Sequence, residues 1–202
     1  MGEFERTSLG TNYPIINLNT TLGIPEINES QYGYFKWNLN ITQTLELAPF
    51  GYTEYMIDAG SVYGDVPFPL LEIHKGNETY AYDNMAFNLM NYYEFASNRY
   101  IGIFADHHFD GYFFNRIPLL RETKFREVLT FRALWGQLNN QNNQSLVFPV
   151  GMESVEKGYY EAGAGIENIL KVFRIDAVWR LSYLKHPGIQ GFGIRFGLQI
   201  LL

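Results

Sequence analysis

The chain alternates between apolar and polar residues over long stretches, most strictly at residues 191–202. There the apolar positions carry only large side chains, and the positions between them carry glycine, arginine or glutamine. A period of two is typical of a β-strand with one apolar face and one polar face. The stretch is about twice as long as the ~5–6 residues usual in soluble sheets. Alternating strands of about 9–11 residues are instead typical of transmembrane β-barrels.

Seven further stretches show the same alternation, so the sequence predicts about eight spanning strands. They are residues 13–23, 32–48, 52–63, 99–109, 124–138, 158–168 and 173–184. An even number of strands is usual in bacterial membrane barrels. We interpret residues 1–12 as an irregular lead-in and residues 13–202 as barrel strands. The expected fold class is therefore all-β, an antiparallel transmembrane β-barrel.

Residues 64–98 interrupt the alternation and are rich in tyrosine and asparagine. Within them, residues 85–95 alternate poorly, and the pattern alone leaves open whether they form a spanning strand. Loop lengths favour a loop, because bacterial barrels have short turns on the periplasmic side and longer loops outside. Counting 85–95 as a strand would place the tight turn at 49–51 outside and residues 64–84 in the periplasm. We therefore interpret residues 64–98 as one long outer loop.

The polar positions of the strands predict a face that mixes both charges. Its charged side chains include Glu161, Asp176, Arg180 and Arg195. We interpret this face mainly as a lumen wall whose charges pair with one another. A path for a solute is the functional alternative. On this interpretation the substitution Arg180→Leu is milder than a charge placed on the apolar face, such as Trp179→Arg.

Five glycines share the predicted inner face of the last strands: Gly163, Gly165, Gly191, Gly193 and Gly197. Glycine inside a strand often marks the close approach of another segment, and strand curvature is the alternative explanation. The long loop is the segment that we expect to approach, because its rings could pack there while its hydroxyl groups bond to lumen charges. The tyrosines considered for this role are Tyr80, Tyr82, Tyr92 and Tyr93. Residues 64–98 are thus predicted to fold into the lumen.

Composition narrows the class of protein further. Aromatic residues make up 17% of the chain and charged residues 18%, and no run approaches the ~18 apolar residues of a spanning helix. The absence of cysteine excludes disulfides and thiolate metal sites, and a net charge of −6 argues against a nucleic-acid partner. The first residues lack the pattern of a secretory signal. We therefore expect a piece of a longer exported protein, or a chain whose signal has been removed.

The run Asp106-His107-His108 is the one that suggests a metal or catalytic site. Neighbouring strand residues point to opposite faces, so the two histidines cannot bind one ion, and such sites need three or four protein ligands. The chain contains neither a Gly-x-Ser-x-Gly elbow nor a P-loop. We expect no catalytic residue, no cofactor and no metal. The alternatives are a small barrel that binds an apolar ligand and an outer-membrane hydrolase.

Three runs resemble one protein family: residues 66–95, 106–128 and 173–200, which begin VPFPLLEIHKG, DHHFDGYFFNR and FRIDAVWRLSY. Through them the chain is similar to an uncharacterised family of Bacteroidota-type outer-membrane β-barrels, usually fused to a carboxypeptidase-regulatory-like domain. More distantly, it resembles the surface-antigen barrels that insert or secrete other proteins. Those carry an Arg-Gly-Tyr tip in the loop that enters the lumen, and the run 76–82 lacks this arginine.

This resemblance implies the C-terminal half of a barrel of about sixteen strands, a size within the bacterial range. It implies a location in the cell outer membrane of a Gram-negative bacterium. The expected function is non-enzymatic and concerns transport, assembly or surface display. The expected partner is outer-membrane lipid, and other subunits of an outer-membrane complex are a further candidate. Neither a cargo nor an oligomeric state follows from the sequence.

Overall fold

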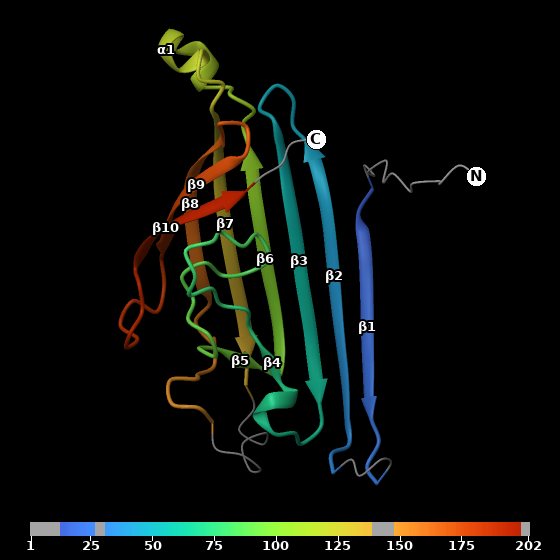
Figure 1. The fold of residues 1–202 in the computed structure, drawn as a ribbon. Helices are drawn as coiled ribbons and strands as arrows, with labels where there is room; N and C mark the ends of the chain where they lie inside the picture. The colour runs from blue at the N-terminus through green and yellow to red at the C-terminus, as the bar shows by residue number, and fades with distance from the viewer. Residues whose placement is uncertain (1–12, 27–30, 139–147, 199–202) are drawn as a thin grey trace, which may run out of the picture.

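The computed structural model describes residues 13–26, 31–138 and 148–198, and one antiparallel sheet of eight strands dominates it (Figure 1). The strands are β1 (Ile15–Gly23), β2 (Tyr34–Glu46), β3 (Tyr52–Tyr63), β6 (Arg99–His108), β7 (Arg126–Gln137), β8 (Tyr159–Ile169), β9 (Phe173–Arg180) and β10 (Phe192–Leu198). Each strand pairs with the next of these in chain order. The predicted lead-in, residues 27–30 and 139–147 of two connections, and the last four residues of the final predicted strand lie outside the described residues.

All eight predicted strands are confirmed, with ends that differ from the prediction by a few residues. Residues 85–95 contain no strand and only isolated bridges, at Phe87 and Phe95. The predicted all-β class is therefore confirmed. Within the described residues the sheet is open, because β1 and β10 each pair with one strand only.

The two faces of the sheet differ in the way that the alternation predicts. Side chains of the apolar parity lie on the uncovered face. They include Ile101, Leu129, Phe131, Trp135, Ile175, Trp179, Phe192 and Phe196. Side chains of the other parity are buried although many are charged. They include Asp106, His108, Arg132, Glu161, Glu167, Arg174, Asp176, Arg180 and Arg195. We call these the apolar face and the charged face.

With one exception, residues 109–125, the shorter connections lie at one end of the sheet and the longer ones at the other. The first end carries residues 47–51, 109–125 and 170–172, and the second of these contains the helices η3 (Phe114–Arg116) and α1 (Pro118–Arg121). The described parts of the connections at the other end are residues 24–26 and 31–33, 64–98, 148–158 and 181–191. In Figure 1, α1 and the short strands of the long loop lie at opposite ends. No helix within the described residues is long and apolar enough to cross a membrane.

The turn between β2 and β3 depends on a glycine. Gly51 has a φ of +85°, a conformation that side chains disfavour, and a Cβ there would lie 1.9 Å from the carbonyl oxygen of His108. The turn is closed by hydrogen bonds between Leu47 and both Phe50 and Gly51. The predicted tight turn is therefore confirmed, and its sharpness lets β3 run directly back along β2.

The long loop between β3 and β6 is an ordered layer on the charged face, beside β8–β10 (Figure 1). It begins with η2 (Phe68–Leu70), and its two ends are joined by the short strands β4 (Glu72–Ile73) and β5 (Ala96–Ser97). Its apolar side chains form the main core with residues of the sheet. This core consists of Phe87, Met90, Phe95, Tyr100, Phe104, Leu134, Val155 and Tyr159. The loop therefore folds by burying its own apolar residues against a face that is otherwise polar.

Candidate functional site

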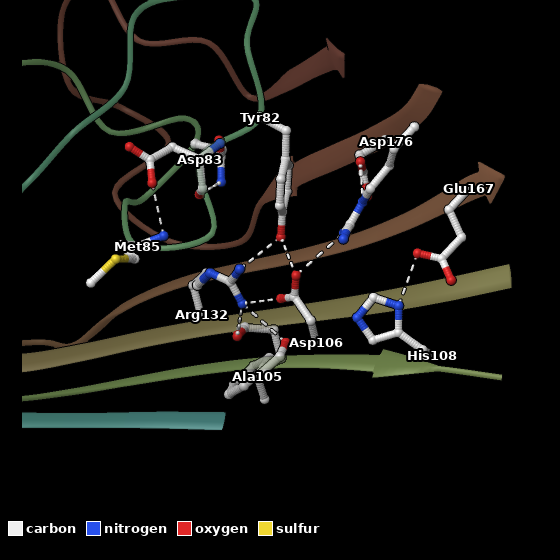
Figure 2. A network of polar contacts seen from close by, with 12 residues as sticks. Tyr82, Asp83, Met85, Ala105, Asp106, His108, Arg132, Glu167 and Asp176 are labelled. Carbon is white, nitrogen blue, oxygen red and sulfur yellow. Dashed lines mark hydrogen bonds and ion pairs between the residues drawn. The ribbon is translucent and has the colours of Figure 1, made fainter. Parts of the chain in front are cut away.

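One polar group between the loop and the sheet is centred on Tyr82. Its hydroxyl donates to Asp106 Oδ2 of β6 at 2.8 Å and accepts from Arg132 Nη2 of β7 at 2.7 Å (Figure 2). Arg132 Nη1 also pairs with Asp106 Oδ1 at 2.6 Å. One tyrosine of the loop thus completes an ion pair that spans two strands. Hydrogen bonds to charged groups are stronger than those between neutral groups.

The same group extends to β9 through a second arginine. Arg174 binds the Asp176 carboxylate through Nε at 2.8 Å and Nη2 at 2.9 Å, and Nη2 lies 3.3 Å from Asp106 Oδ2. The Arg174 guanidinium also lies over the Tyr82 ring, 4.2 Å from its centroid. The group is therefore neutral overall, because the carboxylates of Asp106 and Asp176 balance the two arginines, and Tyr82 lies between them.

A second group fixes the backbone of the loop. The Glu161 carboxylate on β8 accepts from the amides of Asn88 at 2.8 Å and Leu89 at 2.7 Å, and from the Tyr159 hydroxyl at 2.6 Å. Arg195 on β10 donates to the carbonyl oxygen of Asn88 through Nη2 at 2.6 Å. Both charges bind peptide groups that would otherwise be buried without a partner. Residues 88–89 are thereby held between β8 and β10.

A third group joins three loops at the end of the sheet with long connections. Glu94 receives two hydrogen bonds from Arg180 of β9, at 2.9 and 2.5 Å, and both side chains are buried. His186 lies between two carboxylates, with Nδ1 3.1 Å from Glu94 and Nε2 3.2 Å from Glu153. Loops 64–98, 148–158 and 181–191 therefore meet at one ion-paired cluster.

The histidines of the candidate metal run point to opposite faces, as predicted. His108 Nδ1 lies 2.9 Å from Glu167 Oε2, and both side chains are buried. His107 Nδ1 lies 2.8 Å from the hydroxyl of Thr53 on the opposite face. Within the described residues, no three histidine, aspartate or glutamate side chains converge in a way that could hold a metal ion.

Burial and neighbouring groups set the protonation of three side chains of the loop. Burial raises the pKa of Tyr82, so its hydroxyl stays protonated and donates to Asp106. Burial and the charge of Lys36 lower the pKa of His74 to about 3, so His74 is neutral at neutral pH. Burial alone would raise the pKa of Asp83, but the ion pair with Lys75 and the Met85 amide lower it on balance.

Of the four loop tyrosines predicted to pack against the inner face, only one does so. Tyr82 reaches the charged face, whereas the other three are exposed to solvent. Their exposed fractions are 77% for Tyr80, 50% for Tyr92 and 58% for Tyr93. The period-two pattern says nothing about a segment outside strands, so the sequence could not rank these residues.

The glycines of the last strands make room mostly for side chains of the sheet itself. A Cβ at Gly193 would lie 2.9 Å from Leu89 Cδ2 of the loop, as well as 2.7 Å from Arg195. At Gly163, Gly165 and Gly197 the nearest side-chain atoms belong to Thr130, Asp176 and Arg174. Only at Gly193 does the loop supply one of the nearest atoms.

Sequence reasoning missed Glu94 as a site residue. The strand pattern contains no signal for it, because the charged face already carries four acids beside its four arginines, and Glu161 of β8 is the cross-strand neighbour of Arg180. The structure alone shows that Arg180 binds Glu94 of the loop.

We expect Tyr82→Phe to loosen the loop, because it leaves Asp106 and Arg132 with one hydrogen bond fewer each. The expected loss is about 2 kcal/mol, which corresponds to roughly 30-fold faster protease cleavage within residues 64–98 of the folded protein. Tyr80→Phe is the matched control, because the Tyr80 side chain is exposed. Equal cleavage of the two variants would contradict the role given to Tyr82.

These features define a class of protein: an all-β protein built on one antiparallel sheet, whose charged face is covered by an inserted loop. The chain belongs to the family whose model is described as "Family of unknown function (DUF5686) C-terminal domain", which matches residues 3–144. No curated protein and no solved structure matches the chain.

Proposed function

We propose that this chain forms part of the wall of an outer-membrane β-barrel of the transport, assembly or surface-display type. The main evidence is the burial of the two faces of the sheet: the charged side chains are buried, and the apolar side chains are exposed. Trp179 is 43% exposed, whereas the next residue, Arg180, is 2% exposed. A water-exposed sheet normally covers its apolar face and leaves its charges in solvent. Lipid is the surroundings in which the opposite arrangement is stable.

The extent of the apolar face supports the same proposal. It runs across neighbouring strands from β2 to β10, with Phe35, Ile101, Phe131, Ile175 and Phe196 among its exposed side chains. Proteins in water rarely expose continuous apolar patches larger than a few hundred Å². The acyl chains of lipids would cover this apolar surface without requiring another protein.

The loop supports a barrel larger than the eight strands of this sheet. The free edges of β1 and β10 cannot face lipid, since unpaired backbone groups are costly there. Joining these two edges would give an eight-stranded barrel, whose interior is only wide enough for side chains. Residues 64–98 need much more room than that. We therefore propose that further strands complete the wall, in agreement with the family description as a C-terminal domain.

Among the three types, transport is favoured by the uncovered part of the inner surface. Beyond β3, which borders β6, the strands β2 and β1 present facing pairs of uncharged amides, Asn17 with Asn40 and Asn19 with Asn38. Two cavities of about 380 and 400 Å³ lie between the loop and the sheet, and both are lined by Met56, Met85 and Phe104. A loop that covers the inner surface of β6–β10 only would leave a polar passage along β1–β3. No catalytic role is part of this proposal.

Tryptophan fluorescence tests the membrane placement, because all three tryptophans belong to the apolar parity of their strands. They are Trp37, Trp135 and Trp179. We expect vesicles of lipids brominated on the acyl chains to quench the full-length folded protein strongly, and iodide in water to quench it weakly. Unbrominated vesicles are the control. Strong quenching by iodide with none by bromine would contradict the proposal.

A further inference from the structure

The free edge of β10, which is the edge that does not pair with β9, is partly occupied by the long loop. The Phe196 amide donates to the carbonyl oxygen of Tyr80 at 2.8 Å, and the Tyr82 amide donates to the carbonyl oxygen of Phe196 at 2.8 Å. Ala81 and Phe196 thereby form a parallel bridge that is one residue pair long. The loop adds the shortest possible strand to the edge of the sheet.

This contact is linked directly to the charged face. The Tyr82 backbone amide binds the edge of β10, while the Tyr82 hydroxyl binds Asp106 and Arg132. A force that removes residues 80–82 from β10 therefore also acts on the hydrogen bonds of the Tyr82 side chain. The state of the edge and the position of the loop are coupled through one residue.

A barrel requires the same backbone groups. Adjacent strands of an up-and-down barrel are antiparallel, and the strand next to β10 would take the N–H and C=O of Phe196 into its own ladder. The single N–H of Phe196 cannot serve both the loop and a neighbouring strand. The parallel bridge at Ala81 and full pairing of this edge therefore exclude each other.

We infer that the free edge of β10 is a docking site for an antiparallel β-strand from the rest of the same barrel, and that residues 80–82 hold this edge until that strand arrives. This inference rests on the proposed function. The β1 strand of the same sheet is not the occupant, because an eight-stranded barrel leaves no space for the loop. Closing the barrel thus releases the backbone of residues 80–82 from the edge of β10.

Engineered disulfides test this, since residues 1–202 contain no cysteine. The edge pair is Ala81→Cys with Phe196→Cys in the full-length protein. The matched face pair is Leu89→Cys with Gly193→Cys, which ties the loop to the charged face and leaves the edge free. Each variant is folded into vesicles under oxidising conditions. Closed barrels are then recognised by their resistance to SDS in unheated gels, and disulfides by thiol labelling.

For the edge pair, we expect the disulfide and SDS resistance to exclude each other. Molecules with the disulfide should show at least tenfold less SDS resistance, and reductant should restore it. For the face pair, both should occur in the same molecules. Closed molecules that keep the edge disulfide would overturn the inference, as would failure of that disulfide to form at any stage of folding.

Two further outcomes separate the inference from the proposal beneath it. A closed species of twice the protein's mass would identify a second copy as the source of the strand and overturn the assigned occupant. If the cysteine-free parent never becomes SDS-resistant, the proposed barrel fails and the inference fails with it. If the cysteine-free parent is SDS-resistant and the edge-pair variant is also SDS-resistant with its disulfide formed, the inference is overturned while the proposed barrel stands.

Discussion

Arg180→Leu should release the loop from the sheet and cost about 3–5 kcal/mol, because it leaves the buried Glu94 carboxylate without its arginine. The arginine side chain is fully buried and its partner nearly so, with exposed fractions of 0% and 4%. Arg180 also donates to the carbonyl oxygen of Leu89 at 3.2 Å. We expect denaturant unfolding of the membrane-inserted protein to show the loss, and protease cleavage within residues 64–98 to rise at least 100-fold.

Two variants control this prediction. Lys75→Leu removes an ion pair of the same loop, with Asp83, in which the lysine side chain is 62% exposed, so it should cost less than about 1 kcal/mol. Arg180→Leu combined with Glu94→Leu removes both buried charges and should recover much of the loss. A cost for Arg180→Leu no larger than that of Lys75→Leu would show that the buried pair does not hold the loop.

Phe131→Arg should destabilise the protein in lipid by about 2–4 kcal/mol, the cost of an arginine on the lipid face near mid-membrane. Phe131 lies near the middle of β7 and is 42% exposed on the apolar face. Trp179 on β9 lies in the same cross-strand row as Phe131, through Ala162 of β8, so Trp179→Arg should be costly as well. Folding titrations in lipid vesicles measure both values.

The matched control places the same charge on an exposed aromatic residue away from the apolar face. Tyr92 lies in the long loop and is 50% exposed, so Tyr92→Arg should change stability by less than about 0.5 kcal/mol. If the apolar face met water, Phe131→Arg would be equally harmless. Similar values for Phe131→Arg and Tyr92→Arg would therefore contradict the membrane placement.

The sequence expectation for Arg180 is changed by the structure. As one charge among several on a lumen wall, Arg180 should tolerate replacement at a small cost in stability, because such charges face water or one another. The structure gives it a buried partner 86 residues earlier in the chain, Glu94. The cost of Arg180→Leu therefore comes from the carboxylate left behind, which the strand pattern could not show.

The sequence by itself determined the strands and their faces. Side chains alternate strictly along a strand, so residues 173–180 could be assigned to two faces without any tertiary information. The alternation left residues 85–95 open, and the lengths of the connections indicated that residues 64–98 are one loop at the end with the longer loops. The faces of a strand depend only on neighbouring residues, and the lengths of the connections only on where the strands begin and end.

The tertiary structure alone decided what the loop does. Residues 64–98 have no repeating period, so nothing in their order specifies that Tyr82 meets Asp106, that Glu94 meets Arg180, or that Ala81 pairs with the edge of β10. The openness of the sheet between β1 and β10 was likewise not visible in the pattern. Contacts between distant residues depend on how the sheet curves and on which charges remain unbalanced across it. A local pattern carries no information about either.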